Sequence, residues 1–249
     1  MEMRERVAET PEPGLGRSRA PAKLTLSLRI VGVRPDGFHL LESEMVTIDL
    51  ADELEFAEGD GLEVVGNGAV PADESNLVRR ALRVSGRTAH VRLHKRIPMG
   101  GGLGGGSADA AAVLRWAGVT DLALAASLGA DVPFCLLGGR AMVGGIGEVV
   151  EPLPFVNCEF TLLTPPFGVS TPAVYRAWDE LGGPTAEGPN DLEPAALSVE
   201  PRLVEWRDRF EAATGATPVL AGSGATWFVA GTFDGVGFVH ARTLRPEPT

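Results

Sequence analysis

The sequence predicts an α+β fold, and the distribution of its hydrophobic periodicities supports this. Alternation with a period of two dominates the first third of the chain, and helical spacing appears in separate patches after it. Strands and helices do not alternate regularly, which argues against a doubly wound parallel sheet. Pro152 and Pro154 precede a further strand-like segment, so we expect an N-terminal domain over 20–152 and a C-terminal domain over 153–249.

The first third is predicted to be rich in strands. Residues 1–19 mix charged residues with proline and glycine and have no apolar period, which predicts a disordered extension. From Leu24 to Ile30 apolar and polar residues alternate, as expected for a half-buried strand. A turn at 35–37 and a second alternating strand at 46–50 follow, with weaker strand candidates at 54–56 and 62–65.

Helical patches begin further along the chain. Residues of the N-cap type at 73–76 precede a helix predicted over about 75–85, and a strand follows at 89–93. A glycine-rich segment then leads into an alanine-rich helix, for which Ser107 is the expected N-cap. The remaining predictions are helices at about 121–129, 172–181 and 201–213, a strand at 159–164 and an apolar segment at 219–229.

The composition excludes several classes of protein. The 249 residues are 44% hydrophobic and 22% charged, with a net charge of −11, whereas a nucleic-acid-binding protein needs a concentrated basic surface. No apolar run approaches the ~20 residues of a membrane helix, and no signal segment follows the charged start. Cys135 and Cys158 are the only cysteines, too few for a disulfide framework. We therefore expect a cytoplasmic protein without nucleic-acid or membrane partners. For the oligomeric state, which composition does not determine, the expectation is a monomer or weak homodimer.

The glycine-rich segment predicts a phosphate site. Six of the seven residues from 100 to 106 are glycine, more than a tight turn requires. Such a loop brings backbone N–H groups close to a ligand, and the helix dipole adds to them, although a flexible linker is the alternative explanation. A Walker A motif is excluded because no lysine precedes Ser107. The formal G-x-G-x-x-G match is weak evidence for a dinucleotide fold, since a glycine-saturated segment produces it by chance.

Three ordered motifs resemble those of the GHMP kinases, the small-molecule kinases named for galactose, homoserine, mevalonate and phosphomevalonate. They lie at 20–23, 98–110 and 220–226. Within this superfamily the chain is similar to the kinases of 4-diphosphocytidyl-2-C-methyl-D-erythritol, which act in non-mevalonate isoprenoid precursor biosynthesis. The segments that carry this closer resemblance are 36–39, 128–133, 144–148, 165–172 with Tyr175, and 190–194.

The resemblance implies a fold and a set of site residues. The fold would join an N-terminal domain like the second domain of ribosomal protein S5 to a ferredoxin-like C-terminal domain, with ATP and substrate between them. The residues expected to bind ATP are Asn76, Pro98, Met99, Gly100, Gly101, Gly102, Leu103, Gly104, Gly105, Gly106 and Ser107. Those expected to bind the small-molecule substrate are Thr25, Phe38, His39, Thr171, Tyr175, Gly222, Ser223 and Gly224.

Two charged residues are expected to carry the reaction, phosphorylation of the substrate's 2-hydroxyl. Asp131 matches the family's catalytic base, although a lone Asp at a helix terminus can simply be a cap. Lys23 is paired with Asp131 by the resemblance, where it would orient the carboxylate or neutralise the transferring phosphoryl group. No cluster of metal ligands is present, so Mg²⁺ would arrive with ATP, with the Ser107 hydroxyl as a candidate ligand.

Some residues leave the chemistry open. Thr25 stands where the family pattern has Asn, Phe38 where Tyr is commoner, and Ala108 where a second Ser is commoner. Core packing is the alternative role for Phe38 and Tyr175. The chain has 20 arginines and two lysines; the second, Lys95, either adds to the field on the ATP phosphates or is a solvated charge at a strand end, and replacing it with Arg is expected to have little effect. The alternatives to the expected enzyme are another GHMP-type alcohol kinase or a catalytically weak nucleotide-binding descendant.

Overall fold

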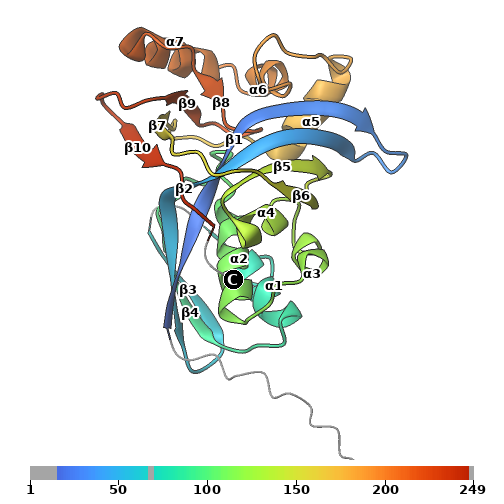
Figure 1. Ribbon diagram of the computed structural model, residues 1–249, viewed down its shortest axis with the longest axis vertical. Helices are drawn as coiled ribbons and strands as arrows, with labels where there is room; N and C mark the ends of the chain where they lie inside the picture. Colours follow the sequence, from blue (N-terminus) through green and yellow to red (C-terminus); the bar gives the residue numbers. More distant parts are fainter. Residues whose placement is uncertain (1–15, 67–69, 247–249) are drawn as a thin grey trace, which may run out of the picture.

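Two β-sheets, each accompanied by helices, form the part of the chain that the computed structural model describes, residues 16–66 and 70–246 (Figure 1). The first sheet contains β1 (Gly16–Val33), β2 (His39–Ala57), β3 (Gly61–Gly66), β4 (His90–Lys95), β5 (Arg140–Gly145) and β6 (Val149–Pro152). The second contains β7 (Glu159–Leu163), β8 (Val219–Leu220), β9 (Trp227–Ala230) and β10 (Phe238–Arg242). The predicted α+β class is confirmed.

Helices divide between the sheets in chain order. Four belong to the first sheet, namely α1 (Leu77–Val84), α2 (Gly105–Trp116), α3 (Leu122–Ala126) and α4 (Val132–Leu137). Three lie between β7 and β8 in the chain, namely α5 (Thr171–Glu180), α6 (Glu193–Val199) and α7 (Leu203–Thr214). The second sheet has the strand order β10-β7-β9-β8, which is the 4-1-3-2 order of a ferredoxin-like sheet. In place of that motif's second helix the chain has loop 231–237.

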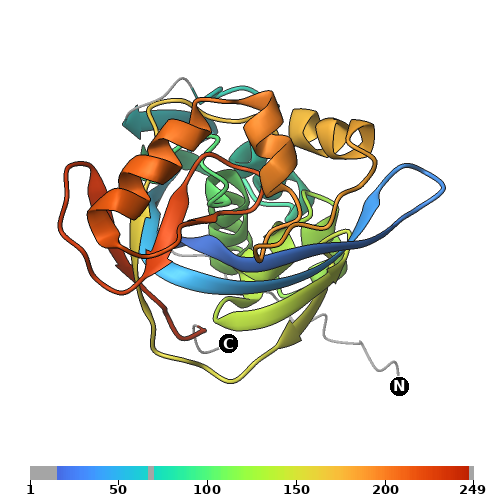
Figure 2. The same ribbon diagram turned by 90° about the horizontal axis from the view of Figure 1, so that it is seen from above.

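The hairpin of β1 and β2 runs the length of the molecule and projects beyond it, as Figure 2 shows from above. Strand β1 lies along one edge of β2, while β4 pairs with residues 53–57 and β5 with residues 41–46 on the other edge. The predicted strands at 46–50 and 54–56 are therefore one continuous strand. The reading of residues 16–19 as disordered is wrong, because β1 begins at Gly16, whose backbone pairs with that of Phe56; residues 1–15 lie outside the described ranges.

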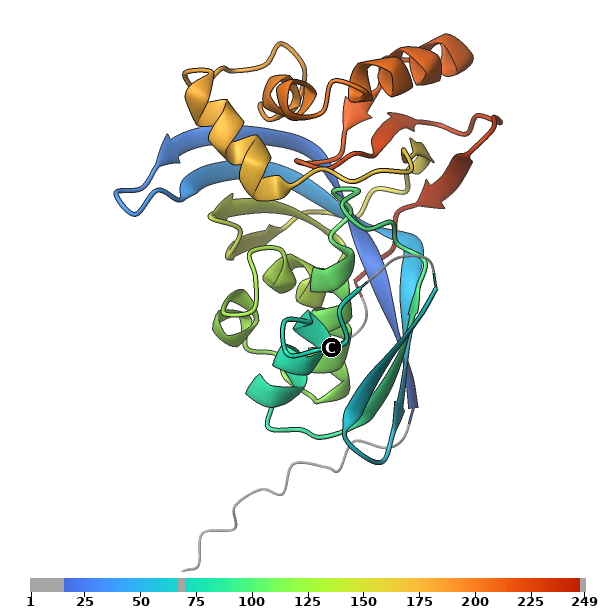
Figure 3. The same cartoon turned by 180° about the vertical axis from the view of Figure 1, so that it is seen from behind.

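Helix α2 is the centre of the first core. All its residues from Ala108 to Leu114 are buried, including Asp109. This helix lies against β1, α1 and α4 (Figure 3). Four alanines in the buried stretch allow the close approach, since an alanine side chain adds little volume. This packing fixes the direction of α2, and with it the position of the glycine loop at its N-terminus.

A second core joins the ferredoxin-like sheet to its helices and to the hairpin. Trp227 and Phe210 are fully buried in it. The segment 190–192 ties this unit to β1, because Asp191 accepts hydrogen bonds from Arg29 Nη1 (2.7 Å) and from the Ile30 backbone N–H (3.0 Å). Within the described ranges, no helix has the length and apolar character needed to cross a bilayer.

Candidate active site

A cavity of about 1000 Å³ lies where the glycine loop, the hairpin and α5 meet. Most of the expected site residues line it: Lys23, Phe38, His39, residues 98–107, Asp131, Thr171, Tyr175, Gly222 and Ser223. Asn76, Thr25 and Gly224 are not among the lining residues. The Asn76 side chain instead caps α1, accepting from Val78 N–H (2.8 Å) and donating to the Pro71 carbonyl (2.7 Å).

The first half of the glycine loop, residues 100–106, packs against the second unit, which consists of the second sheet and helices α5, α6 and α7. The Gly100 carbonyl accepts from the N–H groups of Val169 and Ala225, both at 3.2 Å, and the Gly101 carbonyl accepts from Thr226 N–H at 3.1 Å. Gly102 has φ +76°, and a Cβ there would lie 1.9 Å from the Ala221 carbonyl oxygen. Gly224 must also lack a side chain, because a Cβ there would lie 1.9 Å from Gly102 N. Close backbone contact requires these glycines.

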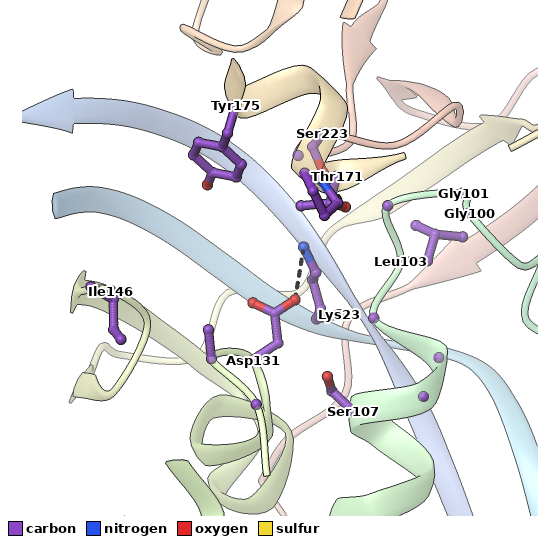
Figure 4. Close-up of a pocket in the computed structure, with 18 of the residues that line it drawn as sticks. Lys23, Gly100, Gly101, Leu103, Ser107, Asp131, Ile146, Thr171, Tyr175 and Ser223 are labelled. Atoms are coloured by element: carbon purple, nitrogen blue, oxygen red, sulfur yellow. Dashed lines mark hydrogen bonds and ion pairs between the residues drawn. The ribbon is translucent and has the colours of Figure 1, made fainter. Parts of the chain in front are cut away.

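The second half of the loop presents amide groups to the cavity. Gly104, in the left-handed region at φ +67°, is the N-cap of α2, so the predicted Ser107 cap is wrong; Ser107 lies in the first turn. The first N–H groups of a helix have no intrahelical acceptor and carry the positive end of its dipole. Gly105, Gly106 and Ser107 therefore offer a site for an anion, next to which the Ser107 side chain lies (Figure 4).

Lys23 and Asp131 face each other in the cavity beside this helix terminus (Figure 4). Lys23 Nζ lies 3.6 Å from Asp131 Oδ2. Asp131 is the N-cap residue of α4, but its side chain makes no capping hydrogen bond. Its carboxylate is 31% exposed while the lysine side chain is 7% exposed. The carboxylate is thus directed to the cavity and the ammonium group, which counts against a purely capping role.

The position of Lys23 is fixed by its neighbours. Its backbone N–H donates to the Leu103 carbonyl (3.1 Å), which joins β1 to the glycine loop. Its Nζ donates to Thr25 Oγ1 at 2.9 Å. Thr25 is almost fully buried, so in this structure its hydroxyl contacts the lysine and not the cavity.

Aromatic and polar side chains gather at the other end of the cavity. His39 Nε2 lies 2.8 Å from Asp179 Oδ1, and the His39 ring centroid lies 4.9 Å from that of Tyr175. Phe38 is 56% exposed, which rules out core packing for it. Tyr175 packs partly against the second core, and burial raises the pKa of its phenol, which stays protonated. Thr171 and Ser223 share a hydrogen bond of 2.8 Å on the wall between the two ends.

Lys95 is not the solvated charge at a strand end that was one of its two expected roles. It is buried and pairs with two buried carboxylates, Asp52 and Asp109, at 2.7 Å from Asp109 Oδ2. It therefore lines the cavity already paired with two carboxylates, so any effect on phosphate would come from the whole cluster. No pattern in the sequence indicated these partners, which come from β2 and α2.

The raised pKa of Asp109 leads to a prediction about how stability depends on pH. Desolvation by burial raises it from 3.8 to about 7; Asp52 adds to the rise and Lys95 opposes it. Between these two values the native state binds more protons than the unfolded chain, so the free energy of unfolding falls as pH rises through this window. Asp109→Asn has no such proton, so its stability relative to the unmodified chain should be higher at pH 8 than at pH 4. Urea denaturation at a series of pH values measures this; a difference independent of pH would contradict it.

An amide-lined helix terminus beside a lysine–carboxylate pair, in a cavity between two α+β units, defines a phosphoryl-transfer enzyme of the small-molecule kinase class. Residues 76–139 match the family model described as "GHMP kinases N terminal domain". The chain is 38% identical over 240 residues to 4-diphosphocytidyl-2-C-methyl-D-erythritol kinase of Paracoccus denitrificans, covering 85% of each, and 39% identical over 241 residues to that of Cereibacter sphaeroides, covering 84% and 87%.

A solved structure of 4-(cytidine 5'-diphospho)-2C-methyl-D-erythritol kinase superposes with a TM-score of 0.70 at 37% identity, covering 86% of this chain and 89% of that one. The chain belongs to the GHMP kinase family, and within it to the group of 4-diphosphocytidyl-2-C-methyl-D-erythritol kinases.

Proposed function

We propose that this chain transfers the γ-phosphoryl group of ATP to the 2-hydroxyl of 4-diphosphocytidyl-2-C-methyl-D-erythritol. The observation that carries the proposal is the continuity of the cavity, which joins the amides of α2, the pair formed by Lys23 and Asp131, and the group around His39 and Tyr175. A phosphate donor, a reacting alcohol and a nucleobase need three such regions in this order. The relatives named above support the choice of substrate. Use of ATP favours a cytoplasmic location, and a monomer or weak homodimer stays a prediction.

The two charged residues divide the work of the transfer. Asp131 Oδ2 accepts the proton of the substrate's 2-hydroxyl group. The hydroxyl oxygen attacks the γ-phosphorus of ATP, and the bond between that phosphorus and the β-phosphate oxygen breaks, leaving ADP. Lys23 holds the carboxylate in place and offsets negative charge at the transferring group. The N–H groups at the start of α2 hold the phosphates without a charged side chain, which is how an acidic protein can bind a triphosphate.

Magnesium fits this site as a companion of ATP. The described residues contain no group of three or more His, Cys, Asp or Glu side chains that could hold a metal ion. Mg²⁺ commonly keeps several waters and binds through substrate phosphates with few protein ligands, so the Ser107 hydroxyl is a sufficient protein candidate. When bound, the ion neutralises phosphate charge.

The cytidine end of the substrate is assigned to the opposite part of the cavity. The exposed ring of Phe38 and the ring of Tyr175 offer faces for stacking on a pyrimidine, and His39 offers polar groups to its edge. Thr171, Gly222 and Ser223 line the wall along which the diphosphate and the methylerythritol would lie.

An ADP-release assay tests the proposed function. Release is measured with 4-diphosphocytidyl-2-C-methyl-D-erythritol and, separately, with mevalonate, homoserine and galactose. We expect release only with the cytidine compound. Release with another alcohol would point to a different GHMP-type kinase, and ATP binding without release in any reaction would point to a nucleotide-binding descendant.

Replacing Lys23 with Arg should damage the reaction while keeping the charge. The Lys23 side chain lies against Thr25, Asp131 and the backbone of Gly104, and these contacts suit a compact ammonium group better than the larger planar fork of a guanidinium. A displacement of about 1 Å at a reacting centre costs on the order of 10²-fold in rate, which is the fall in kcat expected. Steady-state kinetics at saturating ATP measure this kcat. The control is Arg17→Lys on the exposed start of β1, which should leave kcat unchanged. An unchanged kcat for Lys23→Arg would contradict the argument from shape.

A further inference from the structure

The buried cluster of Asp52, Lys95 and Asp109 lies directly below the glycine loop, and no step of the proposed reaction uses it. The three side chains come from β2, the end of β4 and α2, and each is at most 5% exposed. An ion cluster replaced by apolar residues is often no less stable, so its presence at this depth is not accounted for by stability alone.

Asp52 fixes the start of the loop. Its Oδ1 accepts the backbone N–H groups of Arg96 and Ile97 (2.8 Å from Ile97 N), the residues that lead from β4 into the glycines. Its Oδ2 accepts from Lys95 Nζ. Both oxygens are thus engaged, and the chain leaves β4 in one direction.

Lys95 connects this anchor to the end of the loop. Its Nζ donates to Asp109 Oδ2 (2.7 Å) on the second turn of α2 and sits under Gly105, where a Cβ would lie 3.2 Å from it. Asp109 Oδ1 is buried and has no hydrogen-bond partner among the residues that the structure describes. Only one oxygen of Asp109 therefore contributes to the connection, in contrast to Asp52.

We infer that Asp52 and Lys95 are positioning residues for ATP, which hold the two ends of the glycine loop at the separation that presents the α2 amides to the phosphates. Asp109 supplies a single acceptor for the lysine. This inference rests on the proposed binding of ATP by that loop. It predicts that the two aspartates differ in their importance for ATP binding, although both are buried and both contact the same ammonium group.

Asparagine substitutions separate the two aspartates. In Asp109→Asn the amide oxygen keeps the bond to Lys95 and the amide nitrogen replaces an oxygen that has no partner, so the dissociation constant for a non-hydrolysable ATP analogue should stay within about twofold. In Asp52→Asn one amide oxygen cannot serve both the backbone N–H groups and Lys95, so we expect this constant and the KM for ATP to rise about tenfold or more. The KM for the cytidine substrate should change little in either variant.

Asp191→Asn is the matched control. Asp191 is also a buried aspartate that binds an Arg and two backbone N–H groups, but it lies at the hairpin away from the loop. It should lose stability, read as Tm, with ATP affinity unchanged. Equal ATP affinities for Asp52→Asn and Asp109→Asn, or a loss in Asp191→Asn as large as in Asp52→Asn, would overturn the inference.

A second pair of variants applies if Asp52→Asn does not fold. Lys95→Met leaves two carboxylates without a cation, and adding Asp109→Asn removes one of them while Asp52 keeps its backbone bonds. The double variant should bind the ATP analogue more tightly than Lys95→Met alone; equal or weaker binding would contradict the positioning role. Binding of the ATP analogue is measured by calorimetry. If the unmodified chain does not bind ATP, the proposed function itself is rejected. If it binds ATP and these substitutions do not change the affinity, only the positioning role is rejected.

Discussion

Asp131→Asn should lower kcat by about 10² to 10⁴-fold, the range that general base catalysis contributes, while ATP binding stays nearly intact. The amide cannot take the proton of the attacking hydroxyl, but it has almost the same shape as the carboxylate. Because the Asp131 side chain makes no capping bond to α4, the substitution removes no helix cap. Turnover is measured as ADP release, and affinity as calorimetric binding of an ATP analogue.

The control for this substitution is Asp234→Asn. Asp234 is fully exposed on the loop before β10, and within the described part of the chain its side chain forms one long ion pair, with His240 at 3.7 Å. Its kinetics should match those of the unmodified chain. Turnover retained in Asp131→Asn would remove Asp131 from the role of base, and a parallel loss of ATP affinity would place it in nucleotide binding instead.

Gly102→Ala should reduce stability and activity together. The left-handed φ costs about 1–2 kcal/mol for a residue with a side chain, and the collision with the Ala221 carbonyl adds about 1–3 kcal/mol. For a chain of this size a loss of about 3 kcal/mol lowers Tm by about 6–12 °C. The loop must also shift away from the second unit, so kcat/KM should fall with it. Thermal unfolding and steady-state kinetics measure the two effects.

Gly188→Ala is the matched control, because a Cβ at Gly188 would meet no atom of the described residues within 4 Å and its φ is not in the left-handed region. It should leave Tm and kcat/KM close to those of the unmodified chain. If Gly102→Ala were as stable as this control, the close contact between the loop and residues 221–224 would not be needed for folding.

The sequence predicted the local elements well where their residues are half buried. Alternation located β1 and β4, and helical spacing located α1, α5 and α7, because these periods reflect one buried face. It missed β5, β6, α4, α6 and β10, short segments in which neither alternation nor helical spacing is distinct. It also missed the polar start of β1, whose pairing with β2 depends on backbone hydrogen bonds that no side-chain pattern reports.

The site was predicted in part. The junction of a glycine run with an alanine-rich helix indicated phosphate binding, and the ordered motifs indicated Lys23 and Asp131, which the structure places 3.6 Å apart. The sequence pattern indicated ligand contacts for all six glycines, but the structure shows that they serve two different purposes. Gly102 is needed for backbone contact with the second unit, whereas Gly105 and Gly106 begin the helix that faces the cavity.

The expectation that Lys95→Arg would have little effect was wrong in its premise, because Lys95 is enclosed by Asp52, Asp109 and Gly105. By itself the sequence determined the fold class, the family resemblance and the candidate chemistry, since these depend on residue types at short spacings. Only the tertiary structure decided which charges meet and which glycines touch another backbone. Charge pairing and close packing join residues far apart in the chain, and their free energy depends on distance and burial, which the folded structure alone sets.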